Sequence, residues 1–327
     1  MDLLDRLRLD VPVGQAGMGG GLAGPELAAA VAEAGALGTL GLAPAHELRR
    51  SISRVRESAP GRAVVVNLLT PFLRRSQVSV CVEEGVDAAV VAFGGERSLV
   101  EELCAAGVFV FVMVGTEEQA RRAVDWGADA LIAQGGEAGG HLSGTTEALE
   151  FLPRAIAAAD GRPVLLAGGI ATGADTRAAL AAGADGVIAG TRFLLTHESR
   201  AHPEYQRRVL AADRTFRTML FGLGWPAPHR VIPNAATERW CHSDGTAKAV
   251  PRVIGGGSAF LAKLPATTAA LRMQSPRLPL FTPIAPTVGM PASAVDRTAC
   301  YAGESALRMT SVTSARDAVL ELSPGGH

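Results

Sequence analysis

The chain has 327 residues, of which 48% are hydrophobic, and its formal net charge at pH 7 is −1. This length and composition allow one large α/β domain or one domain with an appendage, while the near-neutral charge argues against nucleic acid or an anionic membrane surface as the main partner. The sequence shows neither an apolar signal segment nor an apolar run of transmembrane length, so we expect a cytoplasmic protein.

Between residue 11 and about residue 195, short apolar segments alternate with Ala-rich segments of helical spacing. Three joins from helix to strand repeat one pattern, in which Gly85, Gly127 or Gly183 is followed two residues later by aspartate. Glycine there is expected to end the helix in a left-handed conformation. Eight β/α repeats favour a closed TIM (β/α)8 barrel over the alternative, an open doubly wound sheet. The predicted strands are Val11–Ala16, Leu37–Leu42, Ala63–Asn67, Asp87–Ala92, Val108–Val114, Asp129–Ala133, Pro163–Ala167 and Asp185–Ala189.

After Thr196 this alternation stops. Helical spacing returns at 203–222 and 258–273, but an irregular Pro- and Gly-rich stretch separates these segments, and a run of prolines follows between 276 and 291. Residues 304–322 have the pattern of a final helix, a candidate for the eighth helix of the barrel. We therefore predict a barrel formed by residues 1–199 and 301–327, with a helical and irregular insertion at 200–300 that packs over the barrel and the substrate pocket.

The segment from Ala133 to His141 contains four glycines within positions 135 to 140, directly after a predicted buried strand. Glycine allows the backbone to approach a flat ligand closely. His141 would lie above the carboxyl end of that strand, where α/β barrels keep their chemistry, and the ordinary pKa of imidazole suits a general base. The alternative is an exposed or structural histidine, as we expect for the others, including His229. Glu137 is either an acid or base, or an anchor that accepts backbone N–H bonds.

Two glycine turns lie at the ends of the last two predicted strands. Gly168 and Gly169 follow the seventh strand, and Gly190 with Thr191 follows the eighth. In TIM barrels these two loops form the usual phosphate site through backbone N–H groups, so the pair favours phosphate binding over the alternative of simple tight turns. The four cysteines lack the spacing of a zinc site, and we expect no metal.

Gln15–Met18 and Asn67 also end predicted strands, where amide groups suit the edge of a heterocycle. Together with Gln134–His141, Ala167–Ile170, Gly190–Phe193 and Arg230–Asn234, they resemble the nitronate monooxygenases, formerly called 2-nitropropane dioxygenases, which are FMN-dependent TIM barrels. The resemblance covers roughly residues 8–240 and returns at Tyr301–Gly303. It implies that FMN is the cofactor and His141 the catalytic residue. The residues implied to lie along the flavin ring are Gly17, Met18, Asn67, Gln134, Gly139 and Gly140; those implied to hold the phosphate are Ala167, Gly168, Gly169, Gly190 and Thr191.

The implied reaction is oxidation of an alkyl nitronate by O2 to a carbonyl compound and nitrite, with His141 first removing the α proton when the substrate is a neutral nitroalkane. The implied partners are that small molecule and O2, and barrels of this kind often form homodimers. Two alternatives stay open. An FMN-dependent enoyl-thioester reductase using NAD(P)H shares the Glu-Ala-Gly-Gly-His motif but typically has glutamate where Gln134 stands. A flavin-binding barrel without turnover is the second.

The chain departs from the family pattern at three places. Glycine stands at position 17, where proline is usual, so the first loop is expected to be looser. Leu142-Ser143-Gly144 replaces the common arginine or isoleucine followed by glycine. Val114-Gly115-Thr116 lacks the lysine of relatives that reduce quinones with NADH. The first two departures leave the substrate open, and the third argues against the NADH-using branch.

Overall fold

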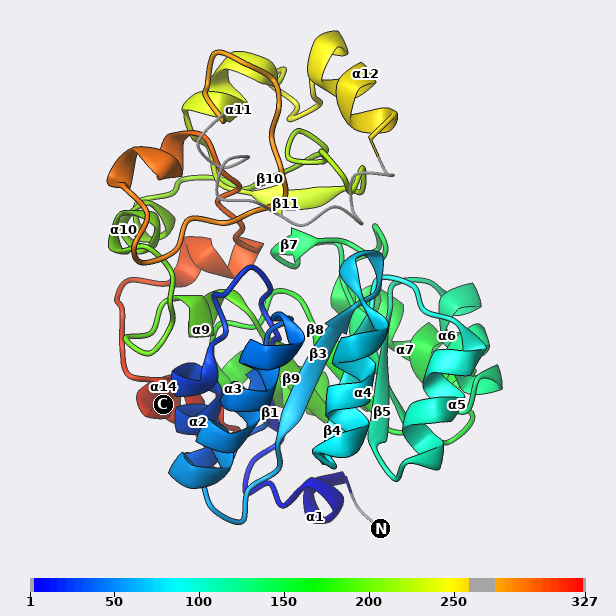
Figure 1. Ribbon diagram of the computed structural model, residues 1–327. Helices are drawn as coiled ribbons and strands as arrows, with labels where there is room; N and C mark the ends of the chain where they lie inside the picture. The colour runs from blue at the N-terminus through cyan, green and yellow to red at the C-terminus, as the bar shows by residue number, and fades with distance from the viewer. Residues whose placement is uncertain (1–2, 259–273, 326–327) are drawn as a thin grey trace.

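Eight parallel strands form a barrel at the centre of the molecule, and helices surround it (Figure 1). The computed structural model describes residues 3–258 and 274–325. The strands follow one another in the order β1-β9-β8-β6-β5-β4-β3-β2, and a parallel bridge between Gly14 and Leu37 joins the first strand to the second. The predicted TIM barrel is thereby confirmed. Its strands are β1 (Val13–Gln15), β2 (Thr39–Leu40), β3 (Val65–Leu69), β4 (Ala88–Ala92), β5 (Phe109–Val114), β6 (Ala130–Gln134), β8 (Val164–Ala167) and β9 (Gly186–Ala189).

The helices cover the outside of the barrel and close its amino-terminal end. In α1 (Leu3–Leu7), both end residues pack against apolar side chains of the barrel interior. Among the helices in the described part of the chain, none is long and apolar enough to cross a membrane. The outer helices are α2 (Pro25–Glu33), α3 (Ala45–Ser58), α4 (Arg75–Glu83), α5 (Arg97–Ala105), α6 (Glu117–Asp125), α7 (Ala148–Ala158) and α8 (Gly173–Ala181), with short turns at η1 (Thr70–Phe72) and α9 (Thr191–Leu194).

The final helix is shorter than the sequence pattern predicts. Residues 304–322 divide into η4 (Glu304–Arg308), an irregular stretch and α14 (Ala315–Leu322). The Ser314 side chain accepts a hydrogen bond from the Asp317 N–H, which caps the start of α14. This helix packs against α2 and α8, so it fills the gap between the first and last helices of the ring.

The repeated glycine-to-aspartate joins have a structural reason. Gly85, Gly127 and Gly183 all adopt positive φ, of 56°, 88° and 98°, which ends each helix as expected. The aspartate two residues later then accepts a hydrogen bond from the backbone of the neighbouring strand; for example, Asp87 accepts from Val64 N at 2.8 Å. The same short pattern therefore ends a helix and fixes the register of two strands.

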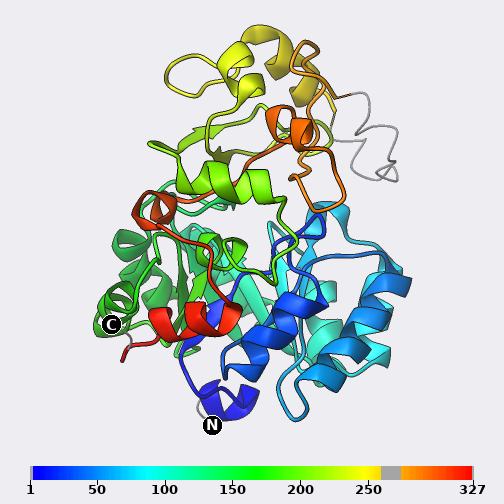
Figure 2. The same cartoon turned by 90° about the vertical axis from the view of Figure 1, so that its left-hand side faces the viewer.

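The described residues of the segment, 200–258 and 274–300, lie over the carboxyl ends of the barrel strands, as Figures 1 and 2 show from two sides. Its strands β10 (Phe216–Thr218) and β11 (His229–Val231) form an antiparallel sheet with β7 (Gly140–His141), which belongs to the glycine loop after β6. Its helical elements are α10 (Pro203–Leu210), α11 (Ala235–Trp240), α12 (Ala249–Gly256) and η3 (Ala292–Asp296).

The predicted helix at 203–222 is wrong beyond Leu210. Residues 216–218 pair with β11 instead, so strand pairing at long range overrides the helical spacing of this stretch. The predicted helix at 258–273 falls outside the described residues from position 259 onward.

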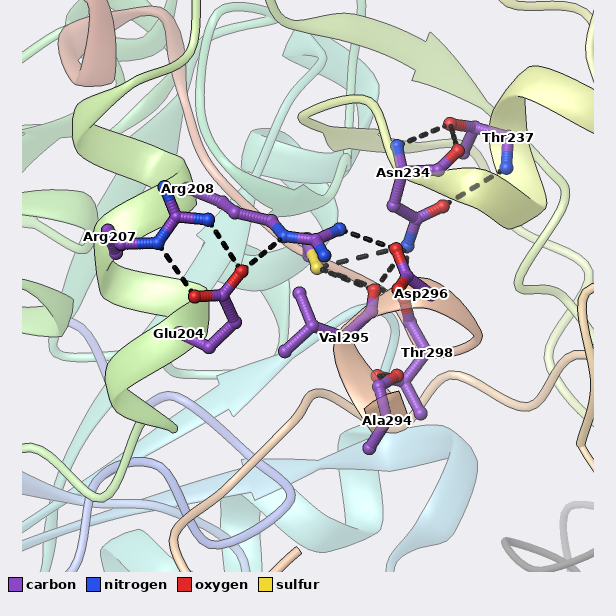
Figure 3. Close-up of polar contacts among 10 residues, drawn as sticks. Glu204, Arg207, Arg208, Asn234, Thr237, Ala294, Val295, Asp296 and Thr298 are labelled. Carbon is purple, nitrogen blue, oxygen red and sulfur yellow. Dashed lines mark hydrogen bonds and ion pairs between the residues drawn. The ribbon is translucent and has the colours of Figure 1, made fainter. Parts of the chain in front are cut away.

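Polar contacts, some buried and some partly exposed, connect the elements of this segment to one another (Figure 3). Arg208 on α10 bonds both Glu204, at 2.9 Å, and Asp296 on η3, at 2.6 Å. Asn234 caps α11 and donates through Nδ2 to the carbonyl oxygens of Val295 and Thr298, both at 2.8 Å. These bonds hold α10, α11 and η3 in one arrangement above the barrel.

Candidate active site

The glycine loop carries His141 from the end of β6 to the sheet above the barrel. His141 ends β7 and pairs with His229 on β11 in antiparallel register. The histidine therefore lies where the loop from the barrel pairs with a strand of the 200–300 segment. It is 7% exposed, which excludes the alternative of a surface residue.

Most glycines of the loop are explained by contacts within the protein. A Cβ at Gly135 would lie 2.4 Å from the backbone nitrogen of Ala148, and one at Gly139 would lie 2.5 Å from that of Gly303. Gly140 is different, because it has a φ of +78° and no atom within 4 Å of a Cβ position. Open space for close approach of a ligand therefore remains at Gly140 and not at Gly139.

The side chain of Gln134, at the end of β6, forms hydrogen bonds with the backbone of the glycine loop. Its Nε2 donates to the carbonyl oxygen of His141 at 3.0 Å, and its Oε1 accepts from the backbone nitrogen of Ser143 at 2.7 Å. The side chain is 5% exposed. Both ends of the amide are thus used to fix the backbone on either side of Leu142, beside the catalytic candidate.

Glu137 and Arg230 anchor the same loop. Both carboxylate oxygens of Glu137 accept from the backbone nitrogen of Ala148 at the start of α7, at 2.9 and 3.1 Å, and burial raises the pKa of the carboxyl. The anchor interpretation of Glu137 is confirmed by these bonds. The guanidinium of Arg230 donates twice to the carbonyl oxygen of Gly136, at 3.2 and 2.8 Å, and pairs with Glu304 at 2.8 Å.

Aromatic rings enclose the His141 imidazole. The indole of Trp225 stacks on it with ring centroids 3.5 Å apart and an angle of 9° between the planes. The rings of Phe93, His229 and Tyr301 lie at 6.0, 5.0 and 5.6 Å. The Nε2 atom of His141 is buried and has no hydrogen-bond partner. Burial, with a smaller effect of His229, lowers the pKa of His141 well below 6.5, so the imidazole is neutral at pH 7.

His229 is the structural neighbour of this imidazole. Its Nε2 accepts from the backbone nitrogen of Phe221 at 3.3 Å, which requires the proton on Nδ1, and Nδ1 donates to the carbonyl oxygen of Ala227 at 3.0 Å. Burial lowers its pKa to about 4. The ring is therefore neutral, with both nitrogens committed to the loop that carries Trp225, in agreement with the structural role expected from sequence.

The turn after β8 contains two glycines with a left-handed backbone. Gly168 and Gly169 have φ of +118° and +71°, which L side chains rarely adopt. Arg308 reaches this turn from η4: it donates to the carbonyl oxygen of Gly169 and pairs with Asp175 at 2.9 Å. Arg308 was not singled out from sequence, because it is 139 residues from Gly169 along the chain and follows no local motif. Its guanidinium lies beside the turn, where the Asp175 carboxylate balances its charge.

Sequence comparison identifies the protein family. The profile of the nitronate monooxygenases matches this chain at residues 2–73 and 56–325. The chain belongs to the nitronate monooxygenase family. A nitronate monooxygenase of Pseudomonas aeruginosa is 38% identical over 167 residues, which cover 47% of this chain and 46% of that protein. The (3aS,4S,5R,7aS)-5-hydroxy-7a-methyl-1-oxo-octahydro-1H-indene-4-carboxyl-CoA dehydrogenase of Mycobacterium tuberculosis is 37% identical over 245 residues, covering 72% of this chain and 67% of that protein.

Two solved structures are similar to this member of the nitronate monooxygenase family over nearly its whole length. FabK from Thermotoga maritima superimposes with a TM-score of 0.78 at 27% identity, covering 98% of this chain and 94% of that one. Nitroalkane oxidase from Streptomyces ansochromogenes gives 0.77 at 29% identity, covering 98% and 96%. The chain spans about two thirds of the length of the curated CoA dehydrogenases. The family and these relatives support a flavin-dependent oxidoreductase.

The rim of the barrel explains one departure from the family pattern. A Cβ at Gly17 would lie 2.2 Å from Cβ of Asn67, so proline does not fit here, and Asn67 Nδ2 donates to the Gly17 carbonyl oxygen at 2.6 Å. The first loop is therefore tied to β3, which corrects the expectation of a looser loop. The neighbouring Met18 is partly buried against two apolar clusters.

The other predicted site residues lie around the same end of the barrel. The side chain of Thr191 accepts a hydrogen bond from Gly303 N at 3.0 Å, which leaves the hydroxyl hydrogen able to donate. Gly190 precedes α9, and Ala167 ends β8, where its carbonyl accepts from Gly135 N at 2.8 Å. The glycine loop and the Gly168–Gly169 turn are thus adjacent.

Proposed function

We propose that this protein is an FMN-dependent nitronate monooxygenase, which oxidises alkyl nitronates with O2 to carbonyl compounds and nitrite. The observation that carries the proposal is the neutral, buried His141 with a free Nε2, held on the glycine loop beside the Gly168–Gly169 turn. Membership of the nitronate monooxygenase family supports it. On this proposal, the barrel of residues 1–199 and 301–327 holds the cofactor, and the segment 200–300 forms the wall of the substrate pocket.

The arrangement of the residues fits FMN. Three features of the structure match the group: positive φ in the turn after β8, the Arg308 guanidinium beside that turn, and open space at Gly140. When bound, FMN would accept electrons from the substrate and pass them to O2. The residues proposed to contact its ring are Gly17, Met18, Asn67, Gln134, Gly139 and Gly140, and those proposed to hold its phosphate are Ala167, Gly168, Gly169, Gly190 and Thr191. Gln134 uses both ends of its amide within the protein and Gly139 is packed against Gly303, so these two residues would support the loop that lies beside the flavin ring. The Thr191 hydroxyl can still donate to the phosphate.

The chemical work of the protein's own residues centres on one proton. A neutral imidazole with an unpaired Nε2 can accept the α proton of a neutral nitroalkane. The neighbouring rings of His229 and Tyr301 are uncharged at neutral pH. The surrounding rings of Phe93 and Trp225 exclude water and favour a small apolar substituent on the substrate. A preformed nitronate anion needs no such base.

This difference between the substrates gives the test. We would measure O2 uptake and nitrite release by the FMN-loaded protein with propyl-1-nitronate and with 1-nitropropane, in the unaltered chain and in His141→Ala. We expect turnover of both substrates by the unaltered chain and a selective loss of the neutral nitroalkane in the variant. Full turnover of 1-nitropropane by His141→Ala would refute the base assignment, and no turnover of either substrate by the unaltered chain would refute the function.

A second candidate function is oxidation or reduction of a CoA thioester. It is favoured by the length of the match to the curated CoA dehydrogenases, which cover more of this chain than the Pseudomonas nitronate monooxygenase does. The enoyl-thioester reductase alternative belongs to this second class. NAD(P)H oxidation stimulated by an enoyl-CoA, without nitrite release from nitronates, would favour it.

A further inference from the structure

Two buried polar atoms without partners lie in the same cluster of rings. Within the described residues, five buried side-chain polar atoms have no hydrogen-bond partner, and two of them are Nε2 of His141 and Oη of Tyr301. The centroids of these two rings lie 5.6 Å apart. Buried polar groups in proteins are almost always paired, so two unpaired atoms on adjacent rings indicate a ligand that supplies the partners.

Two other polar side chains close to Tyr301, those of His229 and Tyr205, already have hydrogen-bond partners. Both ring nitrogens of His229 bond to backbone atoms, so this ring offers nothing to a ligand. The chain has two tyrosines, and the second, Tyr205, donates its hydroxyl hydrogen to the carbonyl oxygen of Tyr301. The Tyr301 hydroxyl is therefore the tyrosine group available in this cluster.

The backbone on both sides of Tyr301 is fixed. Tyr301 forms an antiparallel bridge with Val231 of β11, and Ile232 N donates to the carbonyl oxygen of Cys300 at 2.9 Å. On the other side, Gly303 presses against Gly139, where neither residue leaves room for a side chain. The backbone of Tyr301 is thus held against both β11 and the glycine loop.

The hydroxyl is a donor under all ordinary conditions. Burial raises the pKa of Tyr301, so the group stays protonated at neutral pH. A protonated hydroxyl beside a neutral imidazole suits a planar oxyanion, which can accept from the hydroxyl through one oxygen while its carbon faces the imidazole.

We propose that Tyr301 is a substrate-binding residue whose hydroxyl donates a hydrogen bond to an oxygen of the nitro or nitronate group, next to His141. The assignment rests on the proposed function for the identity of the substrate. It goes beyond that function in naming the group that orients the oxygen atoms. In this proposal His141 accepts the α proton, and the Tyr301 hydroxyl stabilises the negative charge on the nitronate oxygen.

The experiment compares Tyr301→Phe with Tyr205→Phe in the FMN-loaded protein. The first variant removes only the free hydroxyl and keeps the ring contacts with His141 and His229. The second also removes one tyrosine hydroxyl, but one that is bonded to backbone. We would measure kcat and KM for propyl-1-nitronate, and the Kd of inorganic nitrate, an unreactive planar oxyanion, from the change that it causes in flavin absorbance.

We expect Tyr301→Phe to lower kcat/KM and to weaken nitrate binding by about tenfold or more, the usual effect of losing a hydrogen bond to a charged group. Tyr205→Phe should stay within about twofold of the unaltered protein. Equal behaviour of the two variants would overturn the proposal. So would weaker FMN binding by Tyr301→Phe with unchanged nitrate affinity, because the hydroxyl would then serve the cofactor. If the unaltered protein oxidises no nitronate, the proposed function fails, and the nitrate Kd of the two variants still decides the role of Tyr301.

Discussion

The indole of Trp225 lies flat on the imidazole of His141, with ring centroids 3.5 Å apart and planes 9° from parallel. The two residues come from different parts of the chain, since Trp225 belongs to the 200–300 segment and His141 to the loop after β6. Trp225 also contacts Phe93 and Phe72, at 5.0 and 5.4 Å, on loops after other barrel strands. The indole therefore covers the imidazole and links the upper segment to the barrel rim.

Replacing Trp225 by alanine should raise the pKa of His141 towards 6.5. The physical reason is that burial lowers this pKa, and loss of the indole admits water to one face of the imidazole. An NMR titration of the imidazole measures the pKa directly. Trp240→Ala is the matched control, because Trp240 lies in the same segment and donates to the Pro276 carbonyl oxygen away from His141. An unchanged pKa in Trp225→Ala would contradict the burial argument.

Turnover of a neutral nitroalkane should be independent of pH between 8 and 6.5. The base acts in its deprotonated form, and a lowered pKa keeps His141 deprotonated throughout this range. The groups that face it do not change charge there: His229 has a pKa of about 4, and burial raises the pKa of Tyr301. The pH dependence of kcat/KM for 1-nitropropane checks this. A fall in kcat/KM centred at pH 6.5 or above would show an exposed or charge-stabilised imidazole instead.

Folding stability should fall as the pH drops from 6.5 towards 4. The pKa of His229 is about 4 in the folded protein against 6.5 when exposed, so the unfolded chain takes up a proton first and the folded state loses about 3 kcal/mol across this window. Urea unfolding at several pH values measures the slope. His229→Asn should reduce the slope but not abolish it, because burial also lowers the pKa of His141, while His46→Asn, at an exposed position, should leave the slope unchanged. An equal slope in His229→Asn would show that another group dominates acid sensitivity.

Replacing Gln134 by glutamate should impair the site without displacing the fold. Glutamate retains the acceptor for Ser143 N but loses the donor to the carbonyl oxygen of His141, which costs about 1–3 kcal/mol of stability and about tenfold in kcat for a neutral nitroalkane. Gln206→Glu is the control, because Gln206 also donates to backbone carbonyls but lies on α10. If both variants lower stability and neither lowers kcat, Gln134 does not position His141.

Part of this site follows from sequence because its determinants are local. The glycine-to-aspartate joins mark the strand starts, and the loop before His141 contains its own anchor, Glu137, four residues away. Positive φ at Gly168 and Gly169 likewise matches a turn read from adjacent glycines. Each of these features depends on residues that are close in the chain or on a motif of fixed spacing.

The remainder depends on contacts between distant segments, which no local pattern records. Trp225 lies in an irregular stretch without a motif, and its place over His141 follows from the pairing of β11 with β7. The helical spacing at 203–222 predicts a longer α10. The spacing contains no sign that residues 216–218 pair with β11, which ends the helical region early. Arg308 ends η4, and only the folded chain shows that it reaches the turn after β8.

Arg308 should contribute to binding of the FMN phosphate. Its guanidinium has five N–H groups, and the bonds to Gly169 and Asp175 leave others for an anion; because the side chain is 48% exposed, we expect Arg308→Gln to weaken FMN binding by only about five- to tenfold. Riboflavin lacks the phosphate, so its Kd should not change. Arg316→Gln, at an exposed position on α14, is the control. Equal weakening for FMN and riboflavin would assign Arg308 to folding of the turn alone.

The central claim is that this barrel binds FMN and transfers electrons to it from a nitronate. The most direct measurement is the visible absorbance of the purified protein without oxygen, after addition of FMN, then NADH, then propyl-1-nitronate. We expect the spectrum of a bound flavin, which NADH leaves unchanged and the nitronate alters. Loss of the flavin absorbance on addition of NADH alone, or no bound flavin after FMN is supplied, would contradict it.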